Sequence, residues 1–449
     1  MIKNLFRNLY LKRDILRVDK AARNKSWERL SWCKSQMNDY SFKKAKEIVE
    51  YSFLNCEFYN NKYKNVGYEN GDLKSWKDFE KLPILTKDDL REAINDKSIF
   101  SNQSNFKLIK TSTSGSTGVP LTLYFDHIGL KKRSENLWRV SKLFGIGYGK
   151  SVVQLWRKKK QTLSQIFQQK IGSSLTIPVL DVENAAYNSL SENDLDIIIE
   201  KILNFDAKII TGYVSALDSI ATRILQKKIK INSLNHIITA AEALDETTWS
   251  KFERTYGCAV HNFYGGTEVP CLALNIDANH EMSTFDDYHR LEVVNEKTCL
   301  EERNEIGKIL VTDYFMKAMP LIRYENGDLG QLSASNIANH PFRYLNKILG
   351  RINDKFYLPN GKIIYSHIWH IYFREINDIK RFKVIQTAPN NINIFLETNN
   401  IENLNSQIKE LKMNVKKSLG QNININWKLV NQIGLDKTSK FRAVQSLIN

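Results

Sequence analysis

The sequence predicts an α/β protein of two domains: a large N-terminal domain with layered α/β sheets over residues 1–350, and a small α+β domain over residues 351–449. Three observations lead to this prediction. A chain of 449 residues exceeds the size that one hydrophobic core usually organises. From about residue 108, strand and helix patterns alternate, which favours a sheet with ligand sites at its strand ends. After Gly350 the pattern changes to a hairpin followed by a compact α+β unit.

The large domain is expected to begin with a mostly helical lead-in over residues 1–100. Apolar residues at helical spacing predict a helix over 41–55, and Thr86 followed by Asp89 predicts a capped helix start. Further along, the expected helices are 127–144, 194–203 and 216–227, and the expected strands are 108–111, 121–125, 151–156, 207–212, 236–240 and 309–312.

The small domain is expected to open with a hairpin around the Pro359-Asn360-Gly361 turn. Its further elements are a helix over 367–376, strands over 382–386 and 392–396, a helix over 401–419 and a strand over 423–430.

The composition is that of a folded protein. Hydrophobic residues make up 42% of the chain and aromatic residues 11%, which is enough to fill cores and excludes a disordered chain. The net charge of +16 suits ATP, an anionic membrane surface or nucleic acid. Because the basic residues are spread along the chain, with one short run at 158–160, we expect no nucleic-acid partner.

The five cysteines are an odd number and include no CxxC pair, which argues against a disulfide framework and for a cytoplasmic setting. The N-terminus mixes apolar and charged residues, unlike a secretory signal, and no apolar run is long enough to span a bilayer. Apolar residues between Leu5 and Leu16 could line one face of a basic amphipathic helix. Such a helix either docks on its own domain or makes peripheral contact with the inner membrane surface.

One loop carries an anion-binding pattern, because every residue in it is hydroxylic or glycine. Backbone N–H groups and hydroxyls of such a loop can hold a phosphate, although a plain Ser/Gly linker has the same composition. The loop consists of Thr111, Ser112, Thr113, Ser114, Gly115, Ser116, Thr117 and Gly118. The glycine-rich stretch 145–151 superficially suggests a P-loop, but Phe144 occupies the place of its first glycine, so we interpret it as a helix-ending turn.

Two further motifs place carboxylates beside glycines. In the stretch 262–268, an aromatic ring can stack on a base, Thr267 can donate to a phosphate and Glu268 can hold Mg²⁺, although a Gly-Gly hairpin is the plainer interpretation. In the stretch 321–328, Asp328 follows a glycine turn and suits two hydrogen bonds to a ribose diol. Alone, Asn-Gly-Asp is more often just a turn.

In this order and at these spacings, the motifs resemble those of the adenylate-forming superfamily, which includes acyl-CoA synthetases, peptide-synthetase adenylation domains and luciferases. The loop 111–118 resembles its phosphate-binding signature, and 264–268 its aromatic-Gly-x-Thr-Glu motif. Residues 324–328 resemble its Tyr-x-x-Gly-Asp motif, and 350–354 its Gly-Arg-x-Asp-Asp hinge, in which Asn353 replaces an aspartate.

Almost the whole chain also resembles one branch of that superfamily, the phenylacetate–CoA ligases and especially the CapK proteins of capsule and surface-polysaccharide loci. The branch signature Leu-Pro-x-x-Thr-Lys-x-x-Leu stands at 82–90, and Gly-Tyr-x-Ser at 212–215. The segment Ala-Ala-Glu-Ala-Leu stands at 240–244. Leu121 occupies the place of the lysine that ends the phosphate loop in other members, and its absence fits this branch.

The resemblance implies ATP and Mg²⁺ as cofactors. It implies that the loop 111–118 holds the β- and γ-phosphates, that Thr267 contacts the α-phosphate and that Glu268 binds Mg²⁺. Asp328 and Arg351 would bind the ribose. These residues together would form one nucleotide site.

The resemblance also assigns the small domain the role of a mobile lid. Lys440 would bridge the attacking carboxylate and the α-phosphate as pyrophosphate leaves, and the lid would then rotate to admit the acceptor. Tyr264 would pack near the adenine, with Gly265 beside it.

The implied reaction activates a small-molecule carboxylate as an acyl-adenylate. The acyl group then passes to a thiol, for which CoA is a candidate, or to the amine of a sugar or amino acid. Tyr213, Glu242 and Gly266 would line the acyl pocket. An acyl-protein synthetase and a basic polyanion-binding protein without catalysis are the alternatives. Zinc is not expected, because the spacing of Cys258, His261, Cys271 and His280 matches no usual pattern. The sequence leaves the oligomeric state open.

Overall fold

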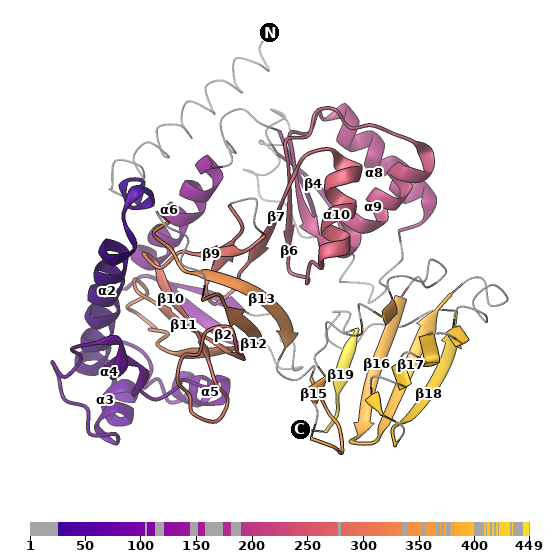
Figure 1. Cartoon of the computed structure of the whole chain (residues 1–449). Coiled ribbons are helices and arrows are strands. Elements are labelled where there is room, and N and C mark those ends of the chain that lie inside the picture. Colours follow the sequence, from indigo (N-terminus) through magenta and orange to yellow (C-terminus); the bar gives the residue numbers. More distant parts are fainter. Residues whose placement is uncertain are drawn as a thin grey trace, which may run out of the picture.

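The computed structural model in Figure 1 describes the large domain and much of the small one. The described residues are 26–103, 106–112, 121–143, 151–157, 174–180, 190–276, 280–334 and 340–351, and in the small domain 355–361, 363–364, 369, 372–373, 379, 381–398, 408–409, 411–413, 415–416, 419–420, 422–431, 433 and 443–448. The expected amphipathic segment 5–16 and the basic run 158–160 lie outside them.

From residue 26 onward, the predicted lead-in is mostly helical. Its elements are η2 (Glu28–Ser31), α2 (Lys34–Asn55), α3 (Glu57–Lys64), α4 (Trp76–Glu80) and α5 (Lys87–Asn95). The predicted start of a helix at Thr86 is confirmed, because its hydroxyl accepts from the N–H of Asp89 and the Asp89 carboxylate accepts from the N–H of Thr86. Such reciprocal bonds satisfy two donors that a helix start otherwise leaves open.

The large domain is built on an 11-stranded sheet with the strand order β10-β11-β12-β13-β9-β8-β7-β6-β5-β3-β4. The strands β3 (Val152–Arg157), β4 (Ser174–Leu180), β5 (Ile209–Tyr213), β6 (His236–Ala240) and β7 (Ala259–Tyr264) run parallel. The helices α8 (Glu192–Asn204), α9 (Val214–Lys227) and α10 (Glu246–Tyr256) lie together on one side of these strands, to their right in Figure 1. Buried faces of the helices and strands share one apolar core.

The other half of the sheet is antiparallel. It consists of β8 (Ala273–Leu274), β9 (Met282–Thr284), β10 (His289–Val294), β11 (Ile306–Asp313), β12 (Tyr324–Leu332) and β13 (Tyr344–Arg351). Its strands share a second core with the lead-in, which includes Tyr59, Phe79, Leu85 and Tyr324. A separate two-stranded sheet pairs β1 (Leu108–Ser112) with β2 (Thr122–Asp126), and α6 (His127–Leu143) follows directly.

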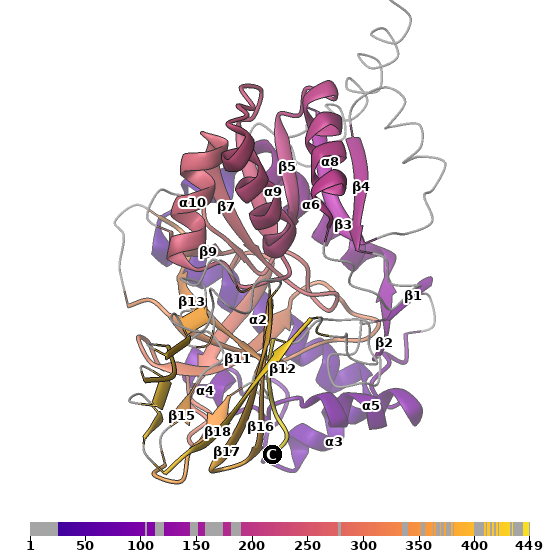
Figure 2. The same cartoon turned by 90° about the vertical axis from the view of Figure 1, so that its right-hand side faces the viewer.

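The small domain is built on a sheet of order β18-β17-β16-β19, with β16 (Arg381–Ala388), β17 (Asn391–Glu397), β18 (Asn424–Val430) and β19 (Val444–Ser446). The hairpin of β14 (Phe356–Tyr357) and β15 (Ile363–Ile364) precedes it. These elements have a core of their own around Trp369, Phe373 and Ile394. Figure 1 shows this sheet beside the large domain, and Figure 2 shows it nearly edge-on.

The predicted fold class is confirmed: a large α/β domain with layered sheets accompanies a small α+β domain. One prediction differs from the structure, because the expected glycine turn around Asn326, Gly327 and Asp328 lies within β12. Gly327 has a φ of +86°, which kinks the strand without ending it. Strands such as β4, β7 and β13 were not predicted, and the expected helices 367–376 and 401–419 fall partly outside the described residues.

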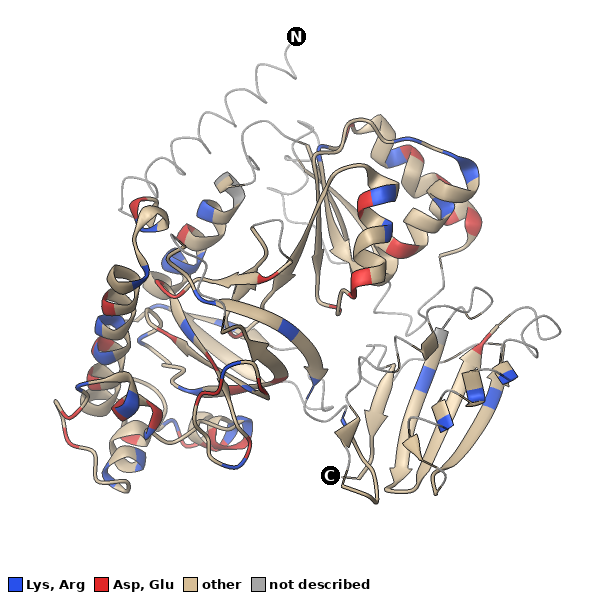
Figure 3. Cartoon of the chain, viewed as in Figure 1, with Lys and Arg blue, Asp and Glu red and all other residues tan. Residues whose placement is uncertain are grey.

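Charged residues are dispersed over the described surface. Figure 3 shows Lys and Arg interspersed with Asp and Glu along α2, α8, α9 and α10. Within the described residues, no helix is both long enough and apolar enough to cross a bilayer.

Candidate active site

Asp328 and Arg351 lie opposite each other in the pairing of β12 with β13. Arg351 Nε lies 3.0 Å from Asp328 Oδ1, and the same guanidinium donates through Nη1 to the carbonyl of Asn326 over 2.9 Å. A side chain at Gly327 would meet Arg351 Nη1 at 3.3 Å, so the glycine leaves room for this contact. The side chain of Asp328 is 14% exposed and that of Arg351 is 42% exposed, so the pair remains open to a ligand.

Tyr264, at the end of β7, completes this cluster. Its hydroxyl donates to Asp328 Oδ2 over 2.8 Å and accepts from Asn326 Nδ2 over 2.7 Å. Burial, and next the charge of Asp328, hold the pKa of Tyr264 well above its usual value, so the phenol stays neutral and keeps its donor. Each carboxylate oxygen of Asp328 already has one partner and can still accept a further hydrogen bond. A diol is therefore a suitable ligand for Asp328.

The stretch from Gly265 to Cys271 is the turn of a hairpin between β7 and β8. Gly265 is required there, because a side chain would meet the backbone nitrogen of Cys271 at 2.5 Å. The N–H of Gly266 donates to the carbonyl of Val269 over 3.0 Å, and a side chain at Gly266 would meet Glu268 Oε2 at 2.9 Å. The plainer interpretation of this motif as a hairpin is thus correct. It does not oppose the site, because Thr267 is exposed and Glu268 half-buried in this turn.

Lys87, the first residue of α5, lies within electrostatic range of Glu268 and Arg351. The N–H of Leu85 donates to the carbonyl of Arg323 over 3.1 Å, and the N–H of Glu325 donates to the carbonyl of Leu85 over 3.0 Å. These bonds attach the lead-in to the first residues of β12. Burial and the charge of Arg91 lower the pKa of Lys87, and they act against the carboxylate of Glu268. In the sequence this lysine is part of the signature at 82–90, which by itself predicts no role for it.

Arg323 fixes the lead-in from below the site. Its buried guanidinium donates to the carbonyls of Leu82 over 2.6 Å and Cys299 over 2.9 Å, and also to the carbonyl of Glu80. Glu292 Oε1, 3.2 Å away, supplies the opposite charge. The residue has a φ of +48°, which a non-glycine side chain rarely adopts. The hydrogen bonds and the ion pair of the Arg323 guanidinium outweigh that strain. They hold the stretch just before Lys87 against β12.

The parallel strands end level with one another on the other side of the hairpin. Tyr213, Ala240 and Phe263 are opposite each other in successive strands. The ring of Tyr213 stacks on Trp156, with centroids 4.5 Å apart and planes 11° apart. Since strand spacing is about 4.8 Å, Tyr213 lies roughly 10 Å from the end of β7.

Glu242 follows β6 and reaches the start of α9. Its carboxylate accepts from the backbone N–H of Ser215 over 2.7 Å and from the Ser215 hydroxyl over 3.0 Å. A carboxylate at a helix start is favoured by the unpaired N–H groups there. The structure therefore gives Glu242 a local partner beside Tyr213, while Trp156 and Asn326 are neighbours of the site that the sequence analysis missed.

Several predicted site residues lie outside the described ones: Thr113, Ser114, Gly115, Ser116, Thr117, Gly118 and Lys440. Thr111 and Ser112 are the last residues of β1, and Ser112 pairs with Thr122 of β2. The first two residues of the loop 111–118 therefore belong to a strand, and the role of the loop stays a prediction.

The cysteines and histidines considered for zinc have other surroundings. His261 lies 3.0 Å from His236, and burial lowers the pKa of His261 to about 4. Cys271 is buried, and His280 lies 2.9 Å from Glu246. Within the described part of the chain, no three His, Cys, Asp or Glu side chains gather as a metal-binding group.

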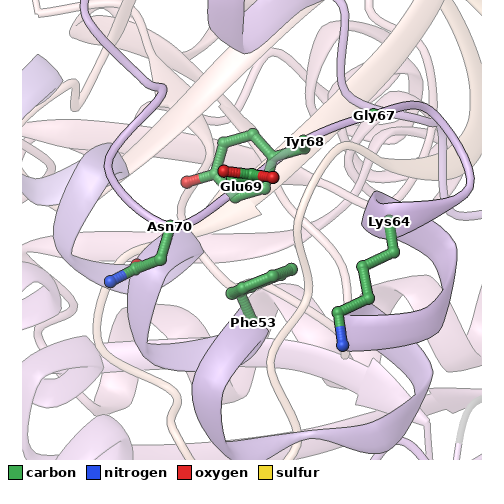
Figure 4. A pocket seen from close by; sticks show the side chains of 6 residues that line it. All are labelled: Phe53, Lys64, Gly67, Tyr68, Glu69 and Asn70. Atoms are coloured by element: carbon green, nitrogen blue, oxygen red, sulfur yellow. The ribbon is translucent and has the colours of Figure 1, made fainter.

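A separate cavity of about 400 Å³ opens in the lead-in. In Figure 4 its Phe53 and Tyr68 rings lie together, with Lys64 and Asn70 on opposite sides of them. The ring centroids are 5.3 Å apart in an edge-on arrangement. The cavity lies between the end of α2 and the stretch after α3, and none of the predicted site residues lines it.

Comparisons with known proteins agree with this geometry. The family model of the CapK C-terminal domain matches residues 356–446. Protein CapK of Staphylococcus aureus is 27% identical over 394 residues, which cover 86% of this chain and 84% of that protein. A structure of 2-hydroxyisobutyryl-CoA ligase in the postadenylation state superposes with a TM-score of 0.75 at 17% identity, over 93% of this chain and 91% of that one. The C-terminal part of the chain thus matches the CapK C-terminal domain family, and the chain as a whole has the fold of adenylate-forming CoA ligases.

Within the superfamily, the chain is similar to the phenylacetate–CoA ligase branch. Phenylacetate-coenzyme A ligase of Pseudomonas putida is 21% identical over 329 residues, 71% of this chain and 71% of that enzyme. An open conformation of the 2-hydroxyisobutyryl-CoA ligase, in complex with 2-HIB-AMP and CoA, superposes less well, with a TM-score of 0.59 at 17% identity over 94% of this chain and 93% of that one. The suspected family of the sequence analysis is confirmed.

Proposed function

We propose that the chain uses ATP to activate a carboxylic acid as an acyl-adenylate, with release of pyrophosphate. The observation that carries this proposal is the hydrogen-bonded cluster of Tyr264, Asp328 and Arg351. It presents a fixed carboxylate to a diol and an aromatic wall beside it. The ribose hydroxyls of ATP would bind Asp328, and the adenine would lie near Tyr264. Reactions of this kind depend mainly on positioning and on the placement of charge.

The phosphates would extend from this cluster toward the turn after β7. Thr267 is an exposed donor there, and Glu268 supplies the hard oxygen that Mg²⁺ prefers alongside substrate phosphates. Bound Mg²⁺ would neutralise the phosphate charge. Lys87 adds a positive charge on the same side. The loop 111–118 and Lys440 complete the proposal through the superfamily resemblance.

The acid would lie at the ends of the parallel strands, between the stacked pair of Trp156 and Tyr213 and the turn that contains Gly266. Glu242 borders this region from the end of β6. The acyl group would then pass to a thiol such as CoA, or to an amine. The solved relative with 2-HIB-AMP and CoA supports a thiol. Work in capsule or surface-polysaccharide assembly rests on the resemblance to CapK-type proteins alone.

The two domains would alternate between orientations for the two steps. Their arrangement here is more similar to the postadenylation state of 2-hydroxyisobutyryl-CoA ligase, at a TM-score of 0.75, than to its thioesterification state, at 0.59. We therefore take the present arrangement as the one for the adenylation step.

The decisive measurement is ATP–pyrophosphate exchange against a panel of carboxylic acids. We expect exchange with at least one acid, and a loss of about a hundredfold in the Lys440→Ala variant, the usual effect of removing one charge-stabilising group. Exchange with no acid would contradict adenylation and favour a polyanion-binding protein. Label transferred to a protein and to neither CoA nor a small amine would favour an acyl-protein synthetase.

Lys87 offers a separate test of the nucleotide site. Replacing it with Met should raise KM for ATP about tenfold, because the variant loses the roughly 1.4 kcal/mol of binding free energy that a half-buried ammonium near the phosphates contributes. The lowered pKa of Lys87 means that its charge disappears at a lower pH than that of an ordinary lysine. KM for ATP should therefore rise at alkaline pH in the wild type and stay flatter in Lys87→Arg, since arginine keeps its charge.

The matched control for Lys87 is Lys81→Met, an exposed lysine of the lead-in that pairs with Asp78. It should leave KM for ATP unchanged. An equal rise in both variants would show that the general charge of the surface, and not Lys87, attracts the nucleotide.

A further inference from the structure

Lys355 begins the small domain and contacts the large one. Its Nζ lies 2.6 Å from Oε1 and 2.7 Å from Oε2 of Glu296. The lysine side chain is 4% exposed and the glutamate side chain 36%. The ammonium of the buried lysine therefore contacts both oxygens of the carboxylate. Charge-assisted bonds of this length are the strong class of protein hydrogen bonds.

Lys355 is fixed to the small domain. The next residue, Phe356, is fully buried in the core of that domain. The residue after it, Tyr357, exchanges two hydrogen bonds with Gln386 of β16, at 3.1 Å from its N–H and 2.8 Å to its carbonyl. Any rotation of the small domain must therefore carry Lys355 with it.

Glu296 is fixed to the large domain. It lies in the turn between β10 and β11, where Asn295 Oδ1 accepts from the N–H of Lys297 over 2.8 Å. The N–H of Asn295 donates to the carbonyl of Leu300 over 3.0 Å. Arg323, which fixes the lead-in below the nucleotide site, donates to the carbonyl of Cys299 in the same turn. The turn thus belongs to the same rigid framework as Asp328.

The ammonium of Lys355 keeps its charge in these surroundings. Burial by itself disfavours the ammonium, but the hydrogen bonds that it donates to Glu296 and Tyr357 hold the pKa of Lys355 above its usual value. The ammonium also lies 5.2 Å from the centre of the Tyr357 ring. Separating the two domains would leave a charge with fewer partners on each side.

We propose that Lys355 and Glu296 are positioning residues for adenylation: their ion pair holds the small domain in the present orientation and must break before the domain turns for the acyl transfer. The proposal rests on the proposed function and on the likeness to the postadenylation state. An interaction made in only one of two states shifts the populations by its own free energy. The pair would act through Lys440, which the small domain carries, and would not touch the substrates.

Exchange kinetics and solution scattering of the full chain test this. Lys355→Met and Glu296→Gln should each lower the kcat of ATP–pyrophosphate exchange about tenfold, which corresponds to about 1.4 kcal/mol. KM for ATP should not change, because the nucleotide residues lie on the large domain. Small-angle X-ray scattering of the nucleotide-free variants should give a larger radius of gyration than that of the wild type. The exchanged pair Lys355→Glu with Glu296→Lys should recover most of both properties.

Lys297→Met, an exposed lysine of the same turn, is the control and should match the wild type in both measurements. The proposal is overturned if Lys355→Met keeps the wild-type kcat or the wild-type scattering, or if Lys297→Met loses as much. A wild type that exchanges with no acid would contradict the proposed function instead. Scattering of Lys355→Met against the wild type would then decide alone whether the pair holds the domain.

Discussion

Replacing Asp328 with alanine is expected to lower kcat/KM for ATP in pyrophosphate exchange by about a thousandfold. The change removes the acceptor that we assign to the ribose diol and leaves Arg351 and the buried hydroxyl of Tyr264 without their shared partner. Two hydrogen bonds to a charged group contribute ~2 kcal/mol each. A loss of about 4 kcal/mol corresponds to about a thousandfold. Initial rates at low ATP concentration measure this ratio directly.

The graded control is Asp328→Asn, which keeps the size of the side chain and one acceptor oxygen for Tyr264. It places an amide donor toward Arg351 or toward the diol, so we expect a smaller loss than in the alanine variant. Urea unfolding should show both variants folded. A folded Asp328→Ala protein with kcat/KM within about threefold of the wild type, a change below 1 kcal/mol, would remove Asp328 from the nucleotide site.

Local chemistry made part of this site predictable from the sequence. Gly265 is needed because the turn after β7 brings the backbone nitrogen of Cys271 too close for a side chain, and such a need is visible in the sequence as a glycine. Asp328 follows a glycine with positive φ, which also leaves a trace in the sequence. Both features depend on residues within a few positions of each other.

Partners distant along the chain were not predictable in the same way. The pairing of Asp328 with Arg351 depends on the register of β12 and β13, which is interrupted by two bulges. The stack of Trp156 on Tyr213 depends on β3 lying beside β5, and the place of Lys87 depends on Leu85 adding to the start of β12. No periodicity of the sequence encodes these neighbours, because tertiary packing decides them.

The kink at Gly327 shows how a local rule and the whole fold can compete. Asn-Gly-Asp favours a turn when nothing else acts on it. Here β11 pairs with β12 on both sides of the segment, with a bulge at 326–328, and β13 pairs with β12 from Asp328 onward, so the strand resumes after the kink. The turn tendency survives as a positive φ within a strand. That kink directs Asn326 and Asp328 toward Tyr264.

Replacing Asp287 with alanine is expected to destabilise the large domain by about 3–5 kcal/mol, since it leaves buried positive charges without their counterion. Asp287 is fully buried and accepts from Arg29 Nε over 2.6 Å and from Arg139 Nη1 and Nη2 over 2.6 and 2.9 Å. These bonds join the lead-in, through Arg29, to α6, through Arg139. Urea unfolding followed by tryptophan fluorescence should show a lower midpoint.

The pH dependence of stability provides a second test of Asp287. Burial alone would raise the pKa of Asp287, but Arg139 and Arg29 hold it below its usual value. A carboxyl group whose pKa is lower in the folded state stabilises the protein above its unfolded pKa of about 3.9, and this stabilisation is lost as pH falls toward the folded value. The wild type should therefore lose stability in this acid range, and Asp287→Asn should lose less.

The control for Asp287→Ala is Asp218→Ala, which breaks a surface pair with Lys251 and should shift the unfolding free energy by less than about 1 kcal/mol. An equally small shift in Asp287→Ala would mean that the two arginines find other partners, and that the lead-in does not depend on this pair for its place beside the site.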